Sequence, residues 1–96
     1  MDVKSVAVPA SASASAPLDI DVEVTVEGCN SFKRFEANRT VSRLTLRALG
    51  TRTLNVPCPA YIGWEHHIYT DPGSPTRTGP FEVIVNGTPW GTVRVH

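Results

Sequence analysis

The chain of 96 residues contains few of the residues that favour helices. It has no glutamine, one methionine, two lysines and five leucines, whereas valine, isoleucine and threonine together contribute 26 residues. These β-branched residues lose side-chain freedom in a helix and pack well on a pleated sheet. We therefore expect an all-β chain.

The chain also lacks an excess of charge and a long apolar run. Nine Lys and Arg residues balance nine Asp and Glu residues, which gives a formal net charge of zero. This balance argues against a protein whose whole surface binds nucleic acid. No apolar run approaches the roughly 20 residues that a transmembrane helix needs, so we expect no membrane partner.

Signatures of catalysis and metal binding are missing as well. His66 and His67 are adjacent, so on a strand their rings point to opposite faces and cannot both reach one metal ion. The sequence has no Cys-x-x-Cys motif and no Gly-x-Ser-x-Gly elbow. We expect a protein that is not an enzyme and that needs no cofactor.

Period-two alternation predicts several strands. In Leu18–Glu27, aliphatic residues alternate with acidic residues and one threonine. Thr40–Leu49 fits both a strand and a helix, and its Thr and Val content favours the strand. Tyr61–Thr70 is a further strand, and a loop follows it at Asp71–Pro80.

The C-terminal residues predict a β-hairpin. Asn86-Gly87 supplies the two positive-φ positions of a tight turn between Phe81–Val85 and the last residues of the chain. A strict two-residue turn would put the apolar residues of the two arms on opposite faces. One extra residue restores a common apolar face, and Gly91 is the expected place for this bulge.

The first 17 residues differ in composition from the rest. Residues 11–16 are alternating Ser and Ala, with Pro9 before them and Pro17 after them, and this segment has no apolar stripe that would offset the entropy of ordering. We expect residues 1–17 to be a flexible, disordered or extended head and residues 18–96 to be one β domain. The fold class is a small antiparallel β-sandwich, or a small barrel, of about five to seven strands.

Two cysteines, Cys29 and Cys58, lie next to turns and outside the apolar strand centres. A disulfide between them would form in an oxidising compartment, and two buried thiols are the cytosolic alternative. We favour the disulfide. It points to a secreted or particle-associated protein rather than a cytoplasmic one.

Aromatic residues supply one set of candidate binding residues. Trp90 lies between Pro89 and Gly91 at the end of a hairpin, where its ring is expected to be exposed. Tyr61 and Tyr69 are further candidates, because flat rings stack on sugars or anchor a protein partner. Trp64 shares a strand face with two isoleucines, so we assign it to the core, with Ile62 and Ile68.

Basic residues supply the second set. Residues 33–52 carry six basic residues and one acid, and Arg39, Arg43 and Arg47 form a basic row within them. This row would either pair with the acidic face of Leu18–Glu27 or attract an anionic partner, including nucleic acid.

These observations favour a non-enzymatic binding module that recognises a protein or a glycan. The first alternative is a structural, assembly or decoration subunit of a larger particle, which would form a homo-oligomer. The second alternative is a small enzyme inhibitor, or a domain that binds nucleic acid through residues 33–52.

Overall fold

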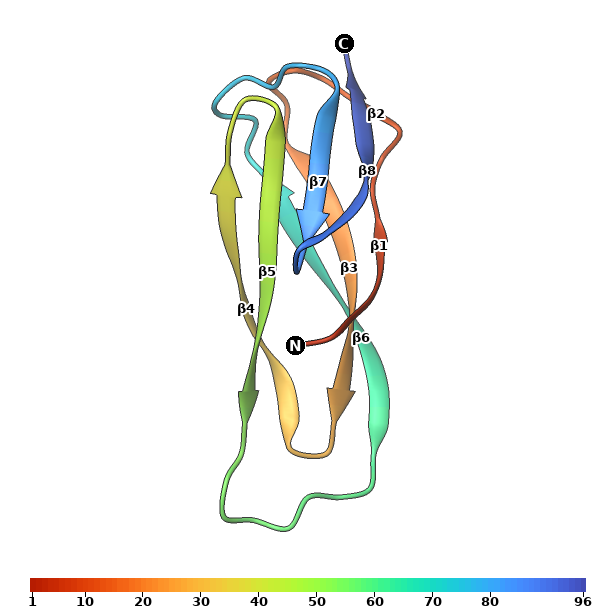
Figure 1. Ribbon diagram of the computed structural model, residues 1–96, viewed down its shortest axis with the longest axis vertical. Coiled ribbons are helices and arrows are strands. Elements are labelled where there is room, and N and C mark those ends of the chain that lie inside the picture. The colour runs from red at the N-terminus through yellow and green to blue at the C-terminus, as the bar shows by residue number, and fades with distance from the viewer.

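The computed structural model describes residues 1–96 and is built of strands and loops only (Figure 1). The molecule is elongated, with extents of 50 × 19 × 19 Å. It contains no helix that is long and apolar enough to cross a membrane. The strands are β1 (Val3–Ala7), β2 (Ser11–Ala12), β3 (Leu18–Glu27), β4 (Asn30–Arg39), β5 (Arg43–Arg52), β6 (Ile62–Asp71), β7 (Phe81–Val85) and β8 (Thr88–Val95).

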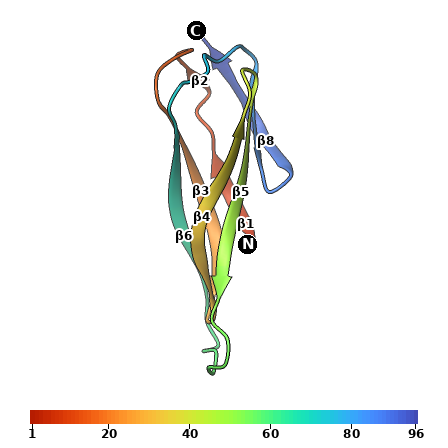
Figure 2. The same cartoon turned by 90° about the vertical axis from the view of Figure 1, so that its left-hand side faces the viewer.

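The strands form a curled sheet that folds over on itself into a small β-sandwich, or half-barrel (Figure 2). One layer is β1-β3-β6, and the other is β4-β5-β7-β8-β2. The layers are joined at the β3–β4 turn, where a single residue pair, Glu27 and Asn30, connects them. Most pairings are antiparallel, but β5–β7 and β2–β8 are parallel. The predicted all-β sandwich class is confirmed.

The core lies between the two layers, and β3 supplies most of one side of it. Alternate residues of β3, from Leu18 to Val26, are buried, while their acidic neighbours point outward. The opposite layer contributes alternate residues of β5, β7 and β8 to the same cluster: Leu44, Leu46, Ala48, Phe81, Val83, Val85 and Val93. The strict alternation of the sequence therefore specifies the register of the sandwich.

The predicted C-terminal hairpin is present. Asn86 and Gly87 have φ angles of 51° and 79°, as a tight hairpin turn requires. The register of β7 against β8 shifts between Val83 and Ile84, which leaves Trp90 as the extra residue beside Gly91. This bulge brings both arms to a common buried face. The ambiguous segment Thr40–Leu49 is a turn followed by β5, so the strand interpretation was correct.

Residues 1–17 differ from the expected flexible head. β1 pairs with β3, and β2 pairs with the end of β8. The half-buried side chains of Met1, Val3, Val6 and Val8 pack against the core. The first apolar residues are too few to form a stripe by themselves, but they cover the open side of a sheet that the rest of the chain provides. The segment is therefore part of the domain.

Sequence patterns also gave no signal for β4. Phe32 and Phe35 are three residues apart, which breaks period two. A register shift against β5 between Phe32 and Arg34 returns both rings to one side, where their centroids lie 4.9 Å apart. A β-bulge therefore concealed this strand in the sequence.

Candidate functional site

The apolar row of β6 points away from the core. Ile62, Trp64 and Ile68 are exposed to 65%, 53% and 61%. The prediction that these three residues belong to the core is therefore wrong. Large, regularly spaced apolar side chains on an outer sheet face are typical of an interaction surface.

The pairing of β6 with β3 explains this orientation. The two strands pair over ten consecutive positions, from Leu18↔Asp71 to Glu27↔Ile62. Residues that face each other across a sheet share a face, so each buried β3 residue turns its β6 partner inward. The inward partners are Gly63, Glu65, His67, Tyr69 and Asp71. The apolar residues of β3 and the register of the two strands therefore determine which face of β6 is buried, and the more apolar face of β6 is left outside.

The loop of residues 53–61 leads into β6 at one end of the molecule (Figure 1). Its large apolar side chains, Leu54, Val56 and Tyr61, are exposed to between 51% and 69%. A shallow groove lies between this loop and the β3–β4 turn. We call the combined set the apolar surface: Leu54, Val56, Tyr61, Ile62, Trp64 and Ile68.

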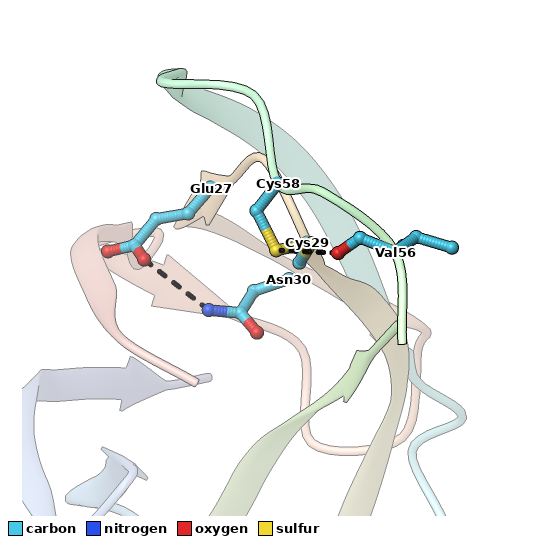
Figure 3. Close-up of a disulfide and its surroundings, with 5 residues drawn as sticks. All are labelled: Glu27, Cys29, Asn30, Val56 and Cys58. Carbon is cyan, nitrogen blue, oxygen red and sulfur yellow. Dashed lines mark hydrogen bonds between the residues drawn. A yellow bond between two sulfur atoms is a disulfide. The ribbon is translucent and has the colours of Figure 1, made fainter. Parts of the chain in front are cut away.

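The loop is attached to the β3–β4 turn at three points. Cys29 and Cys58 form a disulfide, with Cα atoms 5.2 Å apart, as predicted (Figure 3). The backbone N–H of Thr53 donates a hydrogen bond to the Cys29 carbonyl, at 2.9 Å. Pro59 packs so closely on Gly28 that a Cβ there would clash with the Pro59 carbonyl. These attachments hold the loop while its apolar side chains remain uncovered.

An acidic row lies beside Ile62, Trp64 and Ile68 on the same outer face. Asp19, Asp21, Glu23 and Glu27 of β3 are the neighbours of Thr70, Ile68, His66 and Ile62. The positive groups recorded against this row are Lys4 and, when protonated, His66. The Lys4 Nζ lies 4.1 Å from the centroid of the Trp64 ring and 3.8 Å from Glu23 Oε1. The outer face of β1-β3-β6 is thus both apolar and acidic.

His66 is held by two of these carboxylates. Its Nδ1 lies 3.0 Å from Asp21 Oδ1, and its Nε2 lies 3.1 Å from Glu23 Oε2. The hydrogen bond to Asp21 and the charge of Asp21, aided by Glu23, raise the pKa of the His66 ring above its ordinary value of 6.5.

We expect His66 to titrate above pH 6.5 in an NMR titration, and Asp21→Asn to return its pKa toward the ordinary value. Because the pKa of His66 is raised in the folded state, the stabilising contact of its ring with Asp21 and Glu23 is fully present below pH 6.5. This stabilisation is lost as the pH rises through the folded pKa. Asp19→Asn is the control, since no contact joins Asp19 to His66. A titration that is unchanged by Asp21→Asn would refute the assignment.

A buried ion network lies at the other end of β6. The Asp71 carboxylate accepts hydrogen bonds from Arg77 Nη2 at 2.6 Å and from Arg39 Nε at 3.0 Å. The Arg77 and Asp71 side chains are 0% and 1% exposed. Arg77 Nη1 also donates to the carbonyls of Ser13 and Ala16, at 2.7 and 2.8 Å. The network therefore joins β4, β6, the loop before β7 and the N-terminal segment.

The residues predicted as binding candidates are not brought together. Trp90 is half-buried against the core, and Tyr69 faces inward in an edge contact with Phe35, at 5.9 Å between centroids. Burial raises the pKa of the Tyr69 hydroxyl above 10.0, and the Asp71 charge adds to this effect. Of the three predicted aromatic residues, Tyr61 alone belongs to the apolar surface.

The predicted basic row is also divided. Arg39 points inward to Asp71, whereas Arg43 and Arg47 lie on the outer face of the other layer. Arg43 Nε is 2.9 Å from Glu82 Oε1, and Arg47 Nη1 is 3.6 Å from Glu36 Oε1. The outer arginines are thus paired within their own layer and not with the acidic row of β3.

The two tryptophans are expected to differ in their contribution to stability. Trp90→Ala removes a half-buried ring from the core and should lower the free energy of unfolding by roughly 2 to 3 kcal/mol. Trp64→Ala removes an exposed ring and should cost less than about 1 kcal/mol. Urea unfolding of both variants measures this difference. A larger loss for Trp64→Ala than for Trp90→Ala would contradict the exposure of Trp64 and the partial burial of Trp90.

Sequence reasoning missed the apolar surface. It placed Leu54 and Val56 in a short strand, Thr51–Val56, whereas β5 ends at Arg52 and both residues lie in the loop that follows. Comparison with known proteins does not identify the function of this surface. No protein-family model, no curated protein and no solved structure matches this chain.

Proposed function

We propose that this protein is a non-enzymatic binding module that docks a protein partner through the apolar surface. The observation that carries the proposal is the exposure of Leu54, Val56 and Tyr61 in the loop at one end of an elongated domain, and of Ile62 and Trp64 at the start of the strand that follows this loop. Their loop is attached through a disulfide, so the side chains are held ready for contact and little ordering entropy remains to be lost on binding.

The chemistry of the surface favours a protein over a glycan. Leu54, Val56 and Ile62 are aliphatic, and exposed aliphatic side chains gain from burial against a protein. A sugar-binding site relies on a free aromatic face, but Lys4 lies over the Trp64 ring. The Tyr61 hydroxyl end lies against Gly63, which restricts that ring as well.

An assembly subunit is the second candidate, and it uses the same surface. It is supported by the free edge of β6, which pairs with β3 alone. Such an edge can accept a strand of another copy. Binding of nucleic acid through residues 33–52 is less well supported, because Arg43 and Arg47 are already paired with Glu82 and Glu36.

The test is site-specific photocrosslinking in the native source. A benzoylphenylalanine replaces Leu54 in one variant and Val41 in another. Val41 is an exposed apolar residue of the β4–β5 turn, at the opposite end of the molecule (Figure 1). We expect a discrete protein adduct from position 54 that Ile62→Ser abolishes, and no such adduct from position 41.

The adduct also separates the two candidates. An adduct of twice the mass of the chain would favour the assembly subunit, and a heavier or lighter one would favour a different partner protein. The same adducts from both positions, or none that depends on Ile62, would refute the proposal.

A further inference from the structure

We infer that the partner binds as an extended segment in which Lys or Arg alternates with apolar residues, added as a strand to the free edge of β6. This inference rests on the proposed function and names the chemistry of the partner. It concerns the edge and outer face of Ile62–Asp71 rather than the loop of residues 53–61.

The edge of β6 is suited to strand addition. All ten of its residues pair with β3 without a register shift, and it contains no proline and no lysine. Its other edge has no strand partner. A long, regular edge with uncovered backbone groups is a template for another extended chain.

The other edges of the sheet carry features that obstruct pairing. β1 and β4 each contain a register shift, and β4 also presents Lys33 and Arg34. β2 has only two residues. β8 is interrupted by Pro89 and by the bulge at Trp90. Short length, bulges, prolines and lysines are the usual protections of sheet edges, and β6 alone among the edge strands has none of them.

The outer face selects the partner's charge. Four carboxylates of β3 lie one strand away from the β6 edge, and the cations against them are Lys4 and protonated His66. A strand added to β6 would lie two strand spacings from β3, roughly 9 to 10 Å. A Lys or Arg side chain spans most of that distance, and its aliphatic stem would cover Ile62, Trp64 and Ile68 on the way.

Lys4 already shows this mode of contact within the chain. Its ammonium group lies over the Trp64 ring and against Glu23 at the same time. A partner strand would repeat this arrangement from the other side of β6.

The inner side of the edge selects the partner's apolar residues. Alternate residues of an added strand would face the junction between β4 and β6. There the rings of Phe32 and His67 stack at 3.9 Å, and those of Phe35 and Tyr69 meet edge-on. These half-buried rings offer apolar contact to Val, Ile or Leu side chains. The expected pattern is therefore strict alternation of cationic and apolar residues.

The test uses a capped ten-residue peptide, (Lys-Val)5, with the intact, disulfide-bonded protein. We expect NMR hydrogen exchange to show new protection at alternate amides of β6 at saturating peptide, and none in β4 or β1. Binding should weaken at least tenfold when salt is raised from about 50 mM to about 500 mM. (Glu-Val)5 should not bind.

Two further comparisons test the mechanism. N-methylation of alternate peptide residues removes donors that strand addition needs and should weaken binding by at least about tenfold. Ile68→Lys should weaken binding similarly by repelling the peptide, and Val41→Lys is the matched control with no expected effect. Equal binding of the N-methylated or acidic peptide, protection outside β6, or no binding at all would overturn the inference.

The outcomes also separate this inference from the proposed function. If the position-54 adduct forms and depends on Ile62 but the peptide does not bind to β6, the partner is not a cationic strand and the proposed function stands. If the peptide binds to β6 but no such adduct forms, the apolar loop is not a docking surface and the strand site stands on its own.

Discussion

Asp71→Ala is expected to lower the free energy of unfolding by about 3 to 5 kcal/mol, because it leaves Arg77 buried without its carboxylate. Domains of this size are stable by only about 5 to 15 kcal/mol. The variant should therefore be largely unfolded at urea concentrations well below the midpoint of the parent. Urea unfolding followed by circular dichroism gives the difference.

A matched exposed pair provides the control. Glu82→Ala breaks the Arg43–Glu82 pair, whose 2.9 Å contact is comparable but whose side chains are partly exposed. This change should cost less than about 1 kcal/mol. If Asp71→Ala costs no more than Glu82→Ala, then the network does not hold the domain together.

Deletion of residues 1–17 is expected to cost more than about 5 kcal/mol and to leave no stable domain. The deletion removes the β1–β3 pairing, uncovers the core beneath Val3, Val6 and Val8, and removes both carbonyls that accept from Arg77 Nη1. Each buried donor left without a partner costs about 1 to 3 kcal/mol.

The truncated chain is assayed by thermal unfolding, with and without a synthetic peptide of residues 1–17. We expect an unfolded chain alone and recovery of a cooperative transition with the peptide. A truncated chain within about 2 kcal/mol of the full chain would support the flexible head suggested by the sequence and contradict the structure.

Local alternation allowed prediction of the parts of the fold that follow a single period. β3 and the Asn86-Gly87 turn are such cases, since each is specified by adjacent residues. The bulge near Gly91 was predictable because the two arms of the hairpin otherwise conflict. The Cys29–Cys58 disulfide followed from the position of both cysteines beside turns.

The remaining features depend on contacts between distant residues. Trp64 carries the pattern of a core residue, and only its pairing with Thr25 on β3 turns it outward. The sequence places Asp71 and Arg77 in a loop. Only the folded chain brings Arg77 next to the Ser13 carbonyl, which accepts its hydrogen bond. The apolar surface and the ion network depend on strand register and on how the loops close. A short stretch of sequence does not determine either of these.

Hydroxyl-radical footprinting of the intact, disulfide-bonded chain tests the central claim, namely that the apolar row of β6 is uncovered. We predict that Trp64 is oxidised faster than Trp90, and that Leu54 is oxidised faster than Leu44 and Leu46, which are protected. Protection of Trp64 and Ile62 equal to that of Leu44 would place the row in the core and contradict the account.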